Sequence, residues 1–314
     1  MNESTQTVHA ALLPFLGVLR IGGVDAARFL QGQLTNDVQL LADGRTQLAA
    51  LNSPQGRVLA LLRLHQAEDA IYALLPTDLV ETVAALLRRF VLRSKVDLQV
   101  AADLQAGWIG TSALSPALDD TTCDMTRTVS AMPSLTSTHV VSFDYAPGRQ
   151  VIAVTPEAWR SITGLSASRA HPRIENEWTA ADIAEGLPRI GASTSGQFVP
   201  QMLNLDLLDA ISFRKGCYTG QEIVARTQHL GRIKRRMFRF AVASDRPPSP
   251  GDKLLDGDLH AGDVVCAAAT RGGSEILAVM NLQQANHSLR LASAPSLAVT
   301  PLPLPYAVQS PSDA

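Results

Sequence analysis

Hydrophobic and polar positions repeat along this chain with two different periods. Leu79, Val83, Leu87 and their apolar neighbours recur every three or four residues, which predicts a helix over residues 77–90 with Thr77 as its cap. Three strands are predicted before it, between residues 46 and 76, because two runs of turn-forming residues, 52–56 and 66–69, divide the apolar stretches.

The same patterns extend over the rest of the first 230 residues. Residues 17–38 predict a strand, a turn and a short helix capped by Asp25, and residues 94–102 predict another strand. The middle, from about 105 to 147, has weak periodicity and is expected to be rich in loops. A strand from 149, a helix from Thr155 and a helix that ends at Gly186 follow. This mixture favours an antiparallel α+β fold.

The pattern changes after residue 232. Phe238, Phe240 and Val242 alternate with other residues, as in a strand with one buried face, and short strands separated by Gly and Asp turns follow. This spacing predicts a small β-barrel or sandwich. We therefore place a domain boundary near 232–247, with residues 1–235 as one region and 236–314 as a C-terminal domain.

Composition narrows the classes of function. Hydrophobic residues make up 46% of the 314 residues and the net charge is -2, so the chain can form a core and has no sequence-wide attraction for nucleic acid or an acidic membrane. No apolar run approaches the roughly 18 residues of a membrane span, and the N-terminus does not resemble a signal peptide. Three widely spaced cysteines predict neither disulfides nor a metal site. A reducing cytoplasm fits best.

One cysteine has an unusual setting, in the stretch FRKGCYTGQEIVAR (residues 213–226). Thr219 and Glu222 match a capping box, so Cys217 is expected just before a helix N-terminus, where the helix dipole favours an anion. Arg214 and Lys215 add positive charge, and together these features favour a reactive thiolate. A small buried thiol without chemistry is the alternative.

This stretch also resembles a known family. KGCYTGQE (215–222), together with FLQGQLTNDV (29–38), GQFVPQMLNLDLLDAISF (196–213), VAR (224–226) and the terminal LPLPY (302–306), is similar to segments of the YgfZ family of folate-binding proteins, relatives of the glycine-cleavage aminomethyltransferases. The resemblance spans nearly the whole chain, from about residue 10 to residue 306.

The resemblance implies a ring of three domains of the aminomethyltransferase type: two intertwined domains related to ferredoxin-like folds, and a C-terminal β-barrel. It implies tetrahydrofolate, or a one-carbon derivative, as cofactor. It also implies a role in assembling or repairing iron–sulfur clusters, and so in supporting iron–sulfur enzymes that modify tRNA. Cys217 and Lys215 are the residues that family members use. The remaining expected cofactor contacts are Gln33, Asp37, Arg57, Trp178, Gln201, Gly216, Tyr218, Gln221, Glu222 and Arg226.

Several of these residues have a simpler interpretation as well. Asp37 could instead cap the following turn, and Arg57 could be an ordinary solvated arginine. Trp178 and Gln201 could belong to the core. The family's Glu–Ala–Gly run appears here as Ala184-Glu185-Gly186, and a shift of one residue rotates a helical side chain by about 100°, so Glu185 is not assigned to the pterin.

Two rival functions remain at this stage. The first is a folate-dependent aminomethyltransferase-like enzyme, ranked second because those enzymes do not carry the KGC signature. The second is an accessory module that binds tRNA through residues 226–239, a run with six Lys or Arg and no acid. A solvated connection between domains would explain the same run.

Overall fold

A computed structural model describes residues 6–110, 126–129, 140–164, 173–229, 233–285 and 287–308. The chain forms two compact units. The first comprises residues 1–33, 37–49 and 62–175, and the second comprises 34–36, 50–61 and 176–314. The chain therefore passes between the units five times: after residues 33 and 36, within the strands β3 (Thr46–Asn52) and β4 (Val58–Ala67), and after residue 175.

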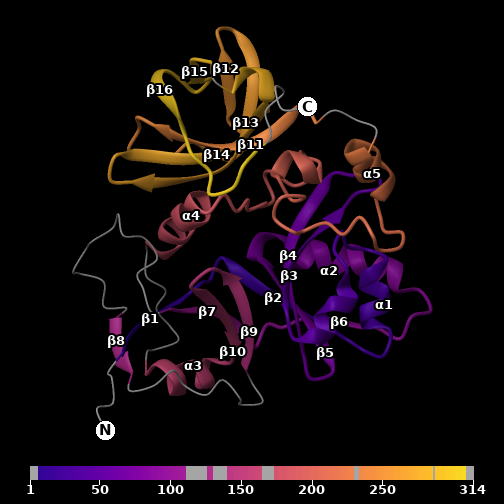
Figure 1. The fold of residues 1–314 in the computed structure, drawn as a ribbon. Helices are drawn as coiled ribbons and strands as arrows, with labels where there is room; N and C mark the ends of the chain where they lie inside the picture. Colours follow the sequence, from indigo (N-terminus) through magenta and orange to yellow (C-terminus); the bar gives the residue numbers. More distant parts are fainter. Residues whose placement is uncertain are drawn as a thin grey trace. The chain divides into compact units, whose positions relative to one another are not determined.

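The first sheet has the strand order β3-β4-β5-β2-β6. Its other strands are β2 (Leu16–Gly22), β5 (Ala70–Pro76) and β6 (Asp97–Val100), and helix α2 (Thr77–Val91) packs on these three strands through a buried face that includes Leu79, Val83 and Leu87. Short α1 (Ala26–Gln31) and the 3-10 helix η1 (Val38–Asp43) precede β3 (Figure 1). The strands and helix predicted over residues 17–100 are thus confirmed.

Two predicted caps have other partners in the structure. Asp25 stands at the N-cap of α1, but its carboxylate accepts from the backbone N–H of Lys95 at 2.8 Å instead of capping the helix. The hydroxyl of Thr77 donates to the carbonyl of Pro14 at 2.9 Å. In both cases a neighbouring loop supplies the partner, which the local sequence does not reveal.

The second sheet has the order β8-β1-β7-β10-β9. Its strands are β1 (Gln6–Leu12), β7 (Gln105–Gly110), β8 (Thr126–Val129), β9 (Val140–Ala146) and β10 (Arg149–Val154), and α3 (Pro156–Thr163) packs its Trp159 into the same core as Ile109 and Ile152. The expectation of a loop-rich stretch over 105–147 is wrong at its ends, because β7 and β9 pair with β10. Residues 111–125 and 130–139 of that stretch lie outside the described residues.

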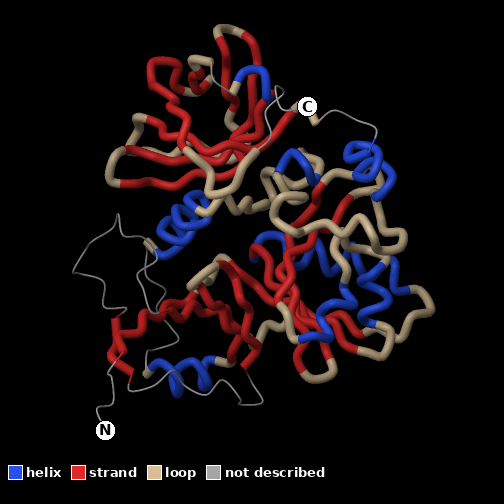
Figure 2. The backbone as a smooth tube through the Cα atoms, in the orientation of Figure 1, coloured by secondary structure: helices blue, strands red, loops and turns tan. Residues whose placement is uncertain are grey.

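The second unit contains α4 (Ile174–Ala184), the 3-10 helix η2 (Pro200–Leu203), α5 (Gln221–His229) and a closed barrel (Figure 1). The barrel order is β11-β14-β13-β12-β15-β16. Its strands are β11 (Arg235–Val242), β12 (Lys253–Asp256), β13 (Leu259–Thr270), β14 (Gly273–Asn281), β15 (Leu289–Leu291) and β16 (Ala294–Leu302), with the short η3 (Leu282–Gln284) after β14 (Figure 2). The predicted C-terminal β-barrel is confirmed.

Alternating apolar positions explain the barrel. Phe240, Val242, Ile276, Ala278 and Met280 are buried in one core, as the period-two pattern of β11 and β14 requires. The precise domain boundary after residue 235 stays a prediction. In the part of the chain that is described, no helix has the length and apolar character needed to cross a membrane.

Candidate functional site

Lys215 anchors the loop that carries the cysteine motif. Its side chain is buried, with 8% of the residue exposed, and its ammonium group donates to the carbonyl oxygens of Leu34 at 2.8 Å and Asn36 at 2.6 Å. The sequence interpretation treated this lysine as a source of charge beside Cys217. The structure instead uses the ammonium to satisfy two buried carbonyls of a neighbouring segment.

Residues 34–36 are held from both sides. The hydroxyl of Thr35 donates to the carbonyl of Ala210 at 2.6 Å and accepts from the backbone N–H of Ala50 at 2.8 Å. The amide of Asn36 donates to the carbonyl of Asp209 at 2.7 Å. The stretch before Cys217 is therefore fixed to residues 34–36 by several buried hydrogen bonds.

Cys217 is exposed, so it is not the small buried thiol of the alternative interpretation. Gly216 is exposed too, and no atom lies within 4 Å of the position that a Cβ would take there. Cys266 differs, because burial and then the negative charge of Asp182 raise the pKa of its thiol to about 12. Cys123 lies outside the described residues. Of the two described cysteines, only Cys217 is accessible to a reagent or substrate.

The helix after the cysteine begins one residue later than the predicted capping box implies. α5 starts at Gln221, and the side-chain oxygen of Gln221 accepts from the backbone N–H of Tyr218 at 3.3 Å. Gly220 causes the displacement, because it adopts a left-handed conformation with φ of 79°. A Cβ at Gly220 would lie 2.5 Å from the carbonyl oxygen of Ser53, so only glycine allows this contact.

The turn after β3 packs on this loop. Gly56 has φ of 69°, and a Cβ there would lie 2.7 Å from the side chain of Ile223. Arg57 is exposed and donates to the carbonyl of Gln197 at 2.7 Å. The turn predicted at residues 52–56 therefore supports the start of α5, and Arg57 stands beside it as an accessible cation.

Tyr218, a predicted cofactor contact, is largely buried beside the lysine. Burial raises the pKa of its hydroxyl to about 12, so the phenol stays neutral at physiological pH. The ammonium of Lys215 lies 5.3 Å from the centre of its ring, within the range of a cation–π contact. Glu222 and Arg226, two further predicted contacts, are exposed on α5.

Trp178 and Gln201 have no exposed surface. The amide of Gln201 donates to the carbonyl of Val224 in α5 at 2.8 Å, and its own backbone carbonyl accepts from Arg236 at 3.0 Å. Both residues thus occupy core positions, which was the alternative to a role in cofactor binding. Their contact with folate stays a prediction.

Gln33 and Asp37 belong to the first unit. Asp37 caps η1, where its carboxylate accepts from the backbone N–H of Gln39 at 3.2 Å and from the side chain of Gln31 at 2.9 Å. The structure therefore confirms that Asp37 caps the following turn, the alternative interpretation of this residue. Its role toward a folate nitrogen stays a prediction, as does that of half-buried Gln33.

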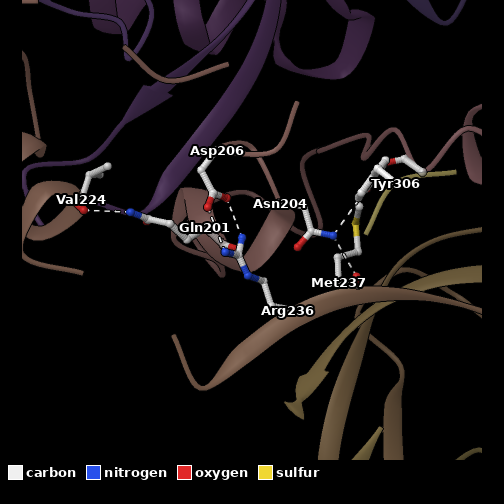
Figure 3. Close-up of polar contacts among 8 residues, drawn as sticks. Gln201, Asn204, Asp206, Val224, Arg236, Met237 and Tyr306 are labelled. Carbon is white, nitrogen blue, oxygen red and sulfur yellow. Dashed lines mark hydrogen bonds and ion pairs between the residues drawn. The ribbon is translucent and has the colours of Figure 1, made fainter. Parts of the chain in front are cut away.

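A buried ion pair that the sequence analysis missed joins β11 to the segment after η2 (Figure 3). Arg236 pairs with Asp206 through both guanidinium nitrogens, at 2.5 and 2.9 Å, and both side chains are 6% exposed. Beside it, the amide of Asn204 donates to the carbonyl of Met237 at 2.8 Å. The partners are separated by about 30 positions in sequence, so no local pattern reveals them.

Half of the predicted basic run is therefore neutralised, since three of its six Lys or Arg residues have acidic partners. Besides the Arg236 pair, Arg235 pairs with Asp263 at 3.1 Å and Arg239 with Glu275 at 2.7 Å. Residues 230–232 lie outside the described residues, and Lys234 is exposed. The absence of acids within the run was a misleading guide, because the carboxylates come from β13, β14 and the segment after η2.

Helix α4 ends just before Gly186, as the sequence predicted. Asp182 is buried, with 1% exposed, whereas Glu185 is half-buried and precedes Gly186 at φ of 67°. The hydroxyl of Tyr306, from the LPLPY segment, donates to the carbonyl of Gly186 at 2.7 Å. Asp182 is a carboxylate of this region that the sequence analysis did not single out. Among the described residues, no group of three or more His, Cys, Asp or Glu is placed to hold a metal ion.

Comparison with known proteins gives the family. No family model matches the chain. The tRNA-modifying protein YgfZ of Colwellia psychrerythraea is 30% identical over 297 residues, covering 92% of this chain and 90% of the relative. That of Klebsiella pneumoniae is 32% identical over 298 residues, covering 90% and 89%.

Among solved structures, glycine cleavage system aminomethyltransferase T from Bartonella henselae superimposes with a TM-score of 0.72 at 14% identity, over 98% of this chain and 88% of that one. At this identity the likeness establishes the aminomethyltransferase-type fold alone. The sequence similarity to the two YgfZ proteins shows more than the fold, because it extends over about nine-tenths of this chain and of each relative. The chain therefore belongs to the YgfZ family.

Proposed function

We propose that this protein binds a reduced folate and supports tRNA modification, by helping to assemble or repair the iron–sulfur clusters of enzymes that modify tRNA. Two findings support a folate-related role in tRNA modification: the similarity to proteins named for tRNA modification, and the aminomethyltransferase-type fold. The use of tetrahydrofolate and the role in iron–sulfur assembly complete the proposal.

The observation that carries the proposal is an exposed thiol on a fixed loop. Cys217 is exposed, while Lys215 two residues before it is anchored to residues 34–36, and Gly220 three residues after it packs on Ser53. A reactive group held in this way loses little conformational freedom when it meets a partner. A cysteine with only a packing role would have been buried.

Tetrahydrofolate is compatible with the side chains near this loop. Both amide atoms of Asn52 are buried without a hydrogen-bond partner among the described residues, and the residue is 2% exposed. Leaving such groups unsatisfied costs about 1–3 kcal/mol each, so a ligand or water is expected to pair with them. A pterin edge carries the complementary donors and acceptors, and Asn52 directly precedes the turn that packs on Gly220.

The anionic end of a folate also has suitable partners. Arg57 and Arg226 are exposed cations on the turn and on α5, and either suits a glutamate carboxylate. In this proposal Asn52 holds the pterin edge, the two arginines hold the glutamate tail, and the cofactor supplies one-carbon chemistry. Cys217 is the group that reacts or transiently binds a client's cluster component.

The rival functions are weaker. An aminomethyltransferase-like enzyme is favoured only by the fold, which many unrelated activities share. A tRNA-binding module at residues 226–239 would need free positive charge, but Arg235, Arg236 and Arg239 are each paired with an acid. The folate-binding factor therefore explains the exposed cysteine better than either.

The test combines binding and activity. Calorimetric titration with tetrahydrofolate is performed on the wild type, Cys217→Ala and Asn52→Leu, and thiolated tRNA is measured in cells carrying each variant as the only copy. We expect Cys217→Ala to bind folate while thiolation is lost, and Asn52→Leu to lose both. No saturable binding by the wild type up to millimolar ligand would eliminate the proposal, and normal thiolation with Cys217→Ala would leave the thiol without a role in it.

A further inference from the structure

A second feature of the molecule is a cationic surface where α2 ends. Phe90 and Leu92 are among the large apolar side chains that the structure leaves exposed, Leu92 at 88%. Arg89 precedes them, Arg93 and Lys95 follow them, and all three are exposed as well. We refer to residues 89–95 as the α2 exit surface.

A neighbouring turn adjoins this surface. The backbone N–H of Lys95 donates to the carboxylate of Asp25 at 2.8 Å, and the N–H of Asp25 donates to the carbonyl of Lys95 at 3.3 Å. Gly23 lies so close that a Cβ would be 2.3 Å from the same carbonyl. Val24, 87% exposed, therefore stands beside the cations of residues 89–95 on two turns that fix each other.

The charge of this surface is not neutralised. In the described part of the chain, Arg89, Arg93 and Lys95 form no ion pair, whereas Arg28 nearby pairs with Asp25 at 3.0 Å. The contrast with β11 is direct, since three arginines there each have a carboxylate partner. The helix dipole favours cations in the last turn of a helix, which can account for Arg89. It does not account for Arg93 and Lys95, because they lie beyond the helix end.

We propose that the α2 exit surface binds the phosphate backbone of tRNA, with Phe90 stacking on an unpaired base. Unpaired Arg and Lys side chains attract phosphates, and an exposed aromatic ring among them offers a stacking surface for bases. The choice of tRNA as the polyanion rests on the proposed function, which derives from relatives named as tRNA-modifying proteins.

Other occupants fit less well. An acidic protein would also meet the charge, and an anionic membrane would accept Val24 and Leu92. The exposed apolar side chains, however, are few: Phe90 lies at the end of α2, and Val24 and Leu92 stand on two turns. They do not form the extended apolar face of a membrane-binding helix. The RNA proposal uses the aromatic ring and the cations together.

The experiment measures the affinity of the purified full-length protein for an unmodified tRNA transcript at several salt concentrations. The variant is Arg89→Gln/Arg93→Gln/Lys95→Gln. The matched control is Arg246→Gln/Lys253→Gln/Arg271→Gln, which removes the same charge from exposed positions in the barrel domain. We expect the first variant to bind at least about tenfold more weakly, with a slope of log affinity against log salt shallower by about two, and the control to stay close to the wild type.

Phe90→Leu separates stacking from charge. We expect it to weaken binding at least about fivefold without changing the salt slope, because base stacking is largely insensitive to salt. Circular dichroism melts establish that each variant is folded. If the triple variant does not fold, the single variant Arg93→Glu, which lies beyond the helix end, replaces it in the tRNA titration.

Each contrary result overturns the proposal. If the triple variant binds tRNA as tightly as the wild type, this surface does not hold the RNA. The same conclusion follows if the control variant loses as much affinity as the triple variant. Binding to phosphatidylserine vesicles in place of tRNA would assign it to a membrane, and loss of cellular thiolation with unchanged tRNA affinity would assign it to a protein. Folate titration of the same samples is independent: a wild type that binds tRNA here but no folate refutes the proposed function and leaves this inference standing.

Discussion

The ammonium nitrogen of Lys215 lies 2.6 Å from the carbonyl oxygen of Asn36, although the two residues are 179 positions apart in the sequence. With the second bond, to Leu34, this contact fixes the start of the cysteine motif to a short segment of the same unit. The lysine of the motif therefore has a structural role, and its effect on the reactivity of Cys217 stays a prediction.

Lys215→Met should destabilise the protein. The change removes a charged donor and leaves two buried carbonyl oxygens unsatisfied, which should lower the free energy of unfolding by about 2–4 kcal/mol. Urea unfolding followed by circular dichroism measures it, with Lys234→Met as the exposed control, expected within about 0.5 kcal/mol of the wild type. Equal stability of Lys215→Met and wild type would mean that the buried ammonium contacts contribute nothing.

The two glycines that flank the cysteine should respond differently to alanine. Gly220→Ala forces a side chain into a left-handed conformation and against the carbonyl of Ser53, so we expect a loss of at least about 1–3 kcal/mol. Gly216→Ala meets open space at a position without positive φ, and its unfolding midpoint should stay near that of the wild type. Thermal melts of the two variants side by side provide the comparison, and a reversed order would contradict the loop geometry.

The Arg236–Asp206 pair should behave as a buried ion pair. Asp206→Asn leaves the guanidinium without a countercharge, and breaking such a pair costs about 3–5 kcal/mol. Replacing both residues, as in Asp206→Leu/Arg236→Met, should recover part of that loss because no buried charge remains. Unfolding free energies of Asp206→Leu, Arg236→Met and the double variant form the cycle, and strictly additive losses would argue against direct coupling.

Local patterns predicted most of the fold. The period of α2 and the alternation in β11 each follow from residues close in sequence, and the structure has both elements where they were predicted. The strands β7 and β9 were missed because the residues around them have weak periodicity, and the partners of β7, which are β1 and β10, lie far from it in the sequence.

The sequence predicted which loop forms the candidate site, but not the contacts that its residues make. KGCYTGQE identified the loop, and the exposure of Cys217 follows the expectation. The acceptors of Lys215, the partner of Arg236 and the buried amide of Asn52 depend on chain segments far apart in sequence. Part of the basic run was therefore already neutralised by acids from distant segments, whereas Arg89, Arg93 and Lys95 at the end of α2 form no ion pair in the described part of the chain.

Cysteine reactivity tests the central residue of the proposal. Iodoacetamide should label Cys217 rapidly near neutral pH, because the thiol is exposed, and should leave Cys266 unlabelled in the folded protein. Burial raises the pKa of Cys266 from 9.0 to about 12, so its protonated form stabilises the fold below pH 9, and that stabilisation is lost as the pH rises toward 12. Cys266 should therefore become reactive only at strongly alkaline pH or on unfolding. Mass spectrometry of each cysteine peptide across the pH range measures both rates, with urea-unfolded protein as the control in which the two should converge. If Cys217 in the folded protein labels as slowly as Cys266 near neutrality, an exposed nucleophile on a fixed loop is the wrong description of this site.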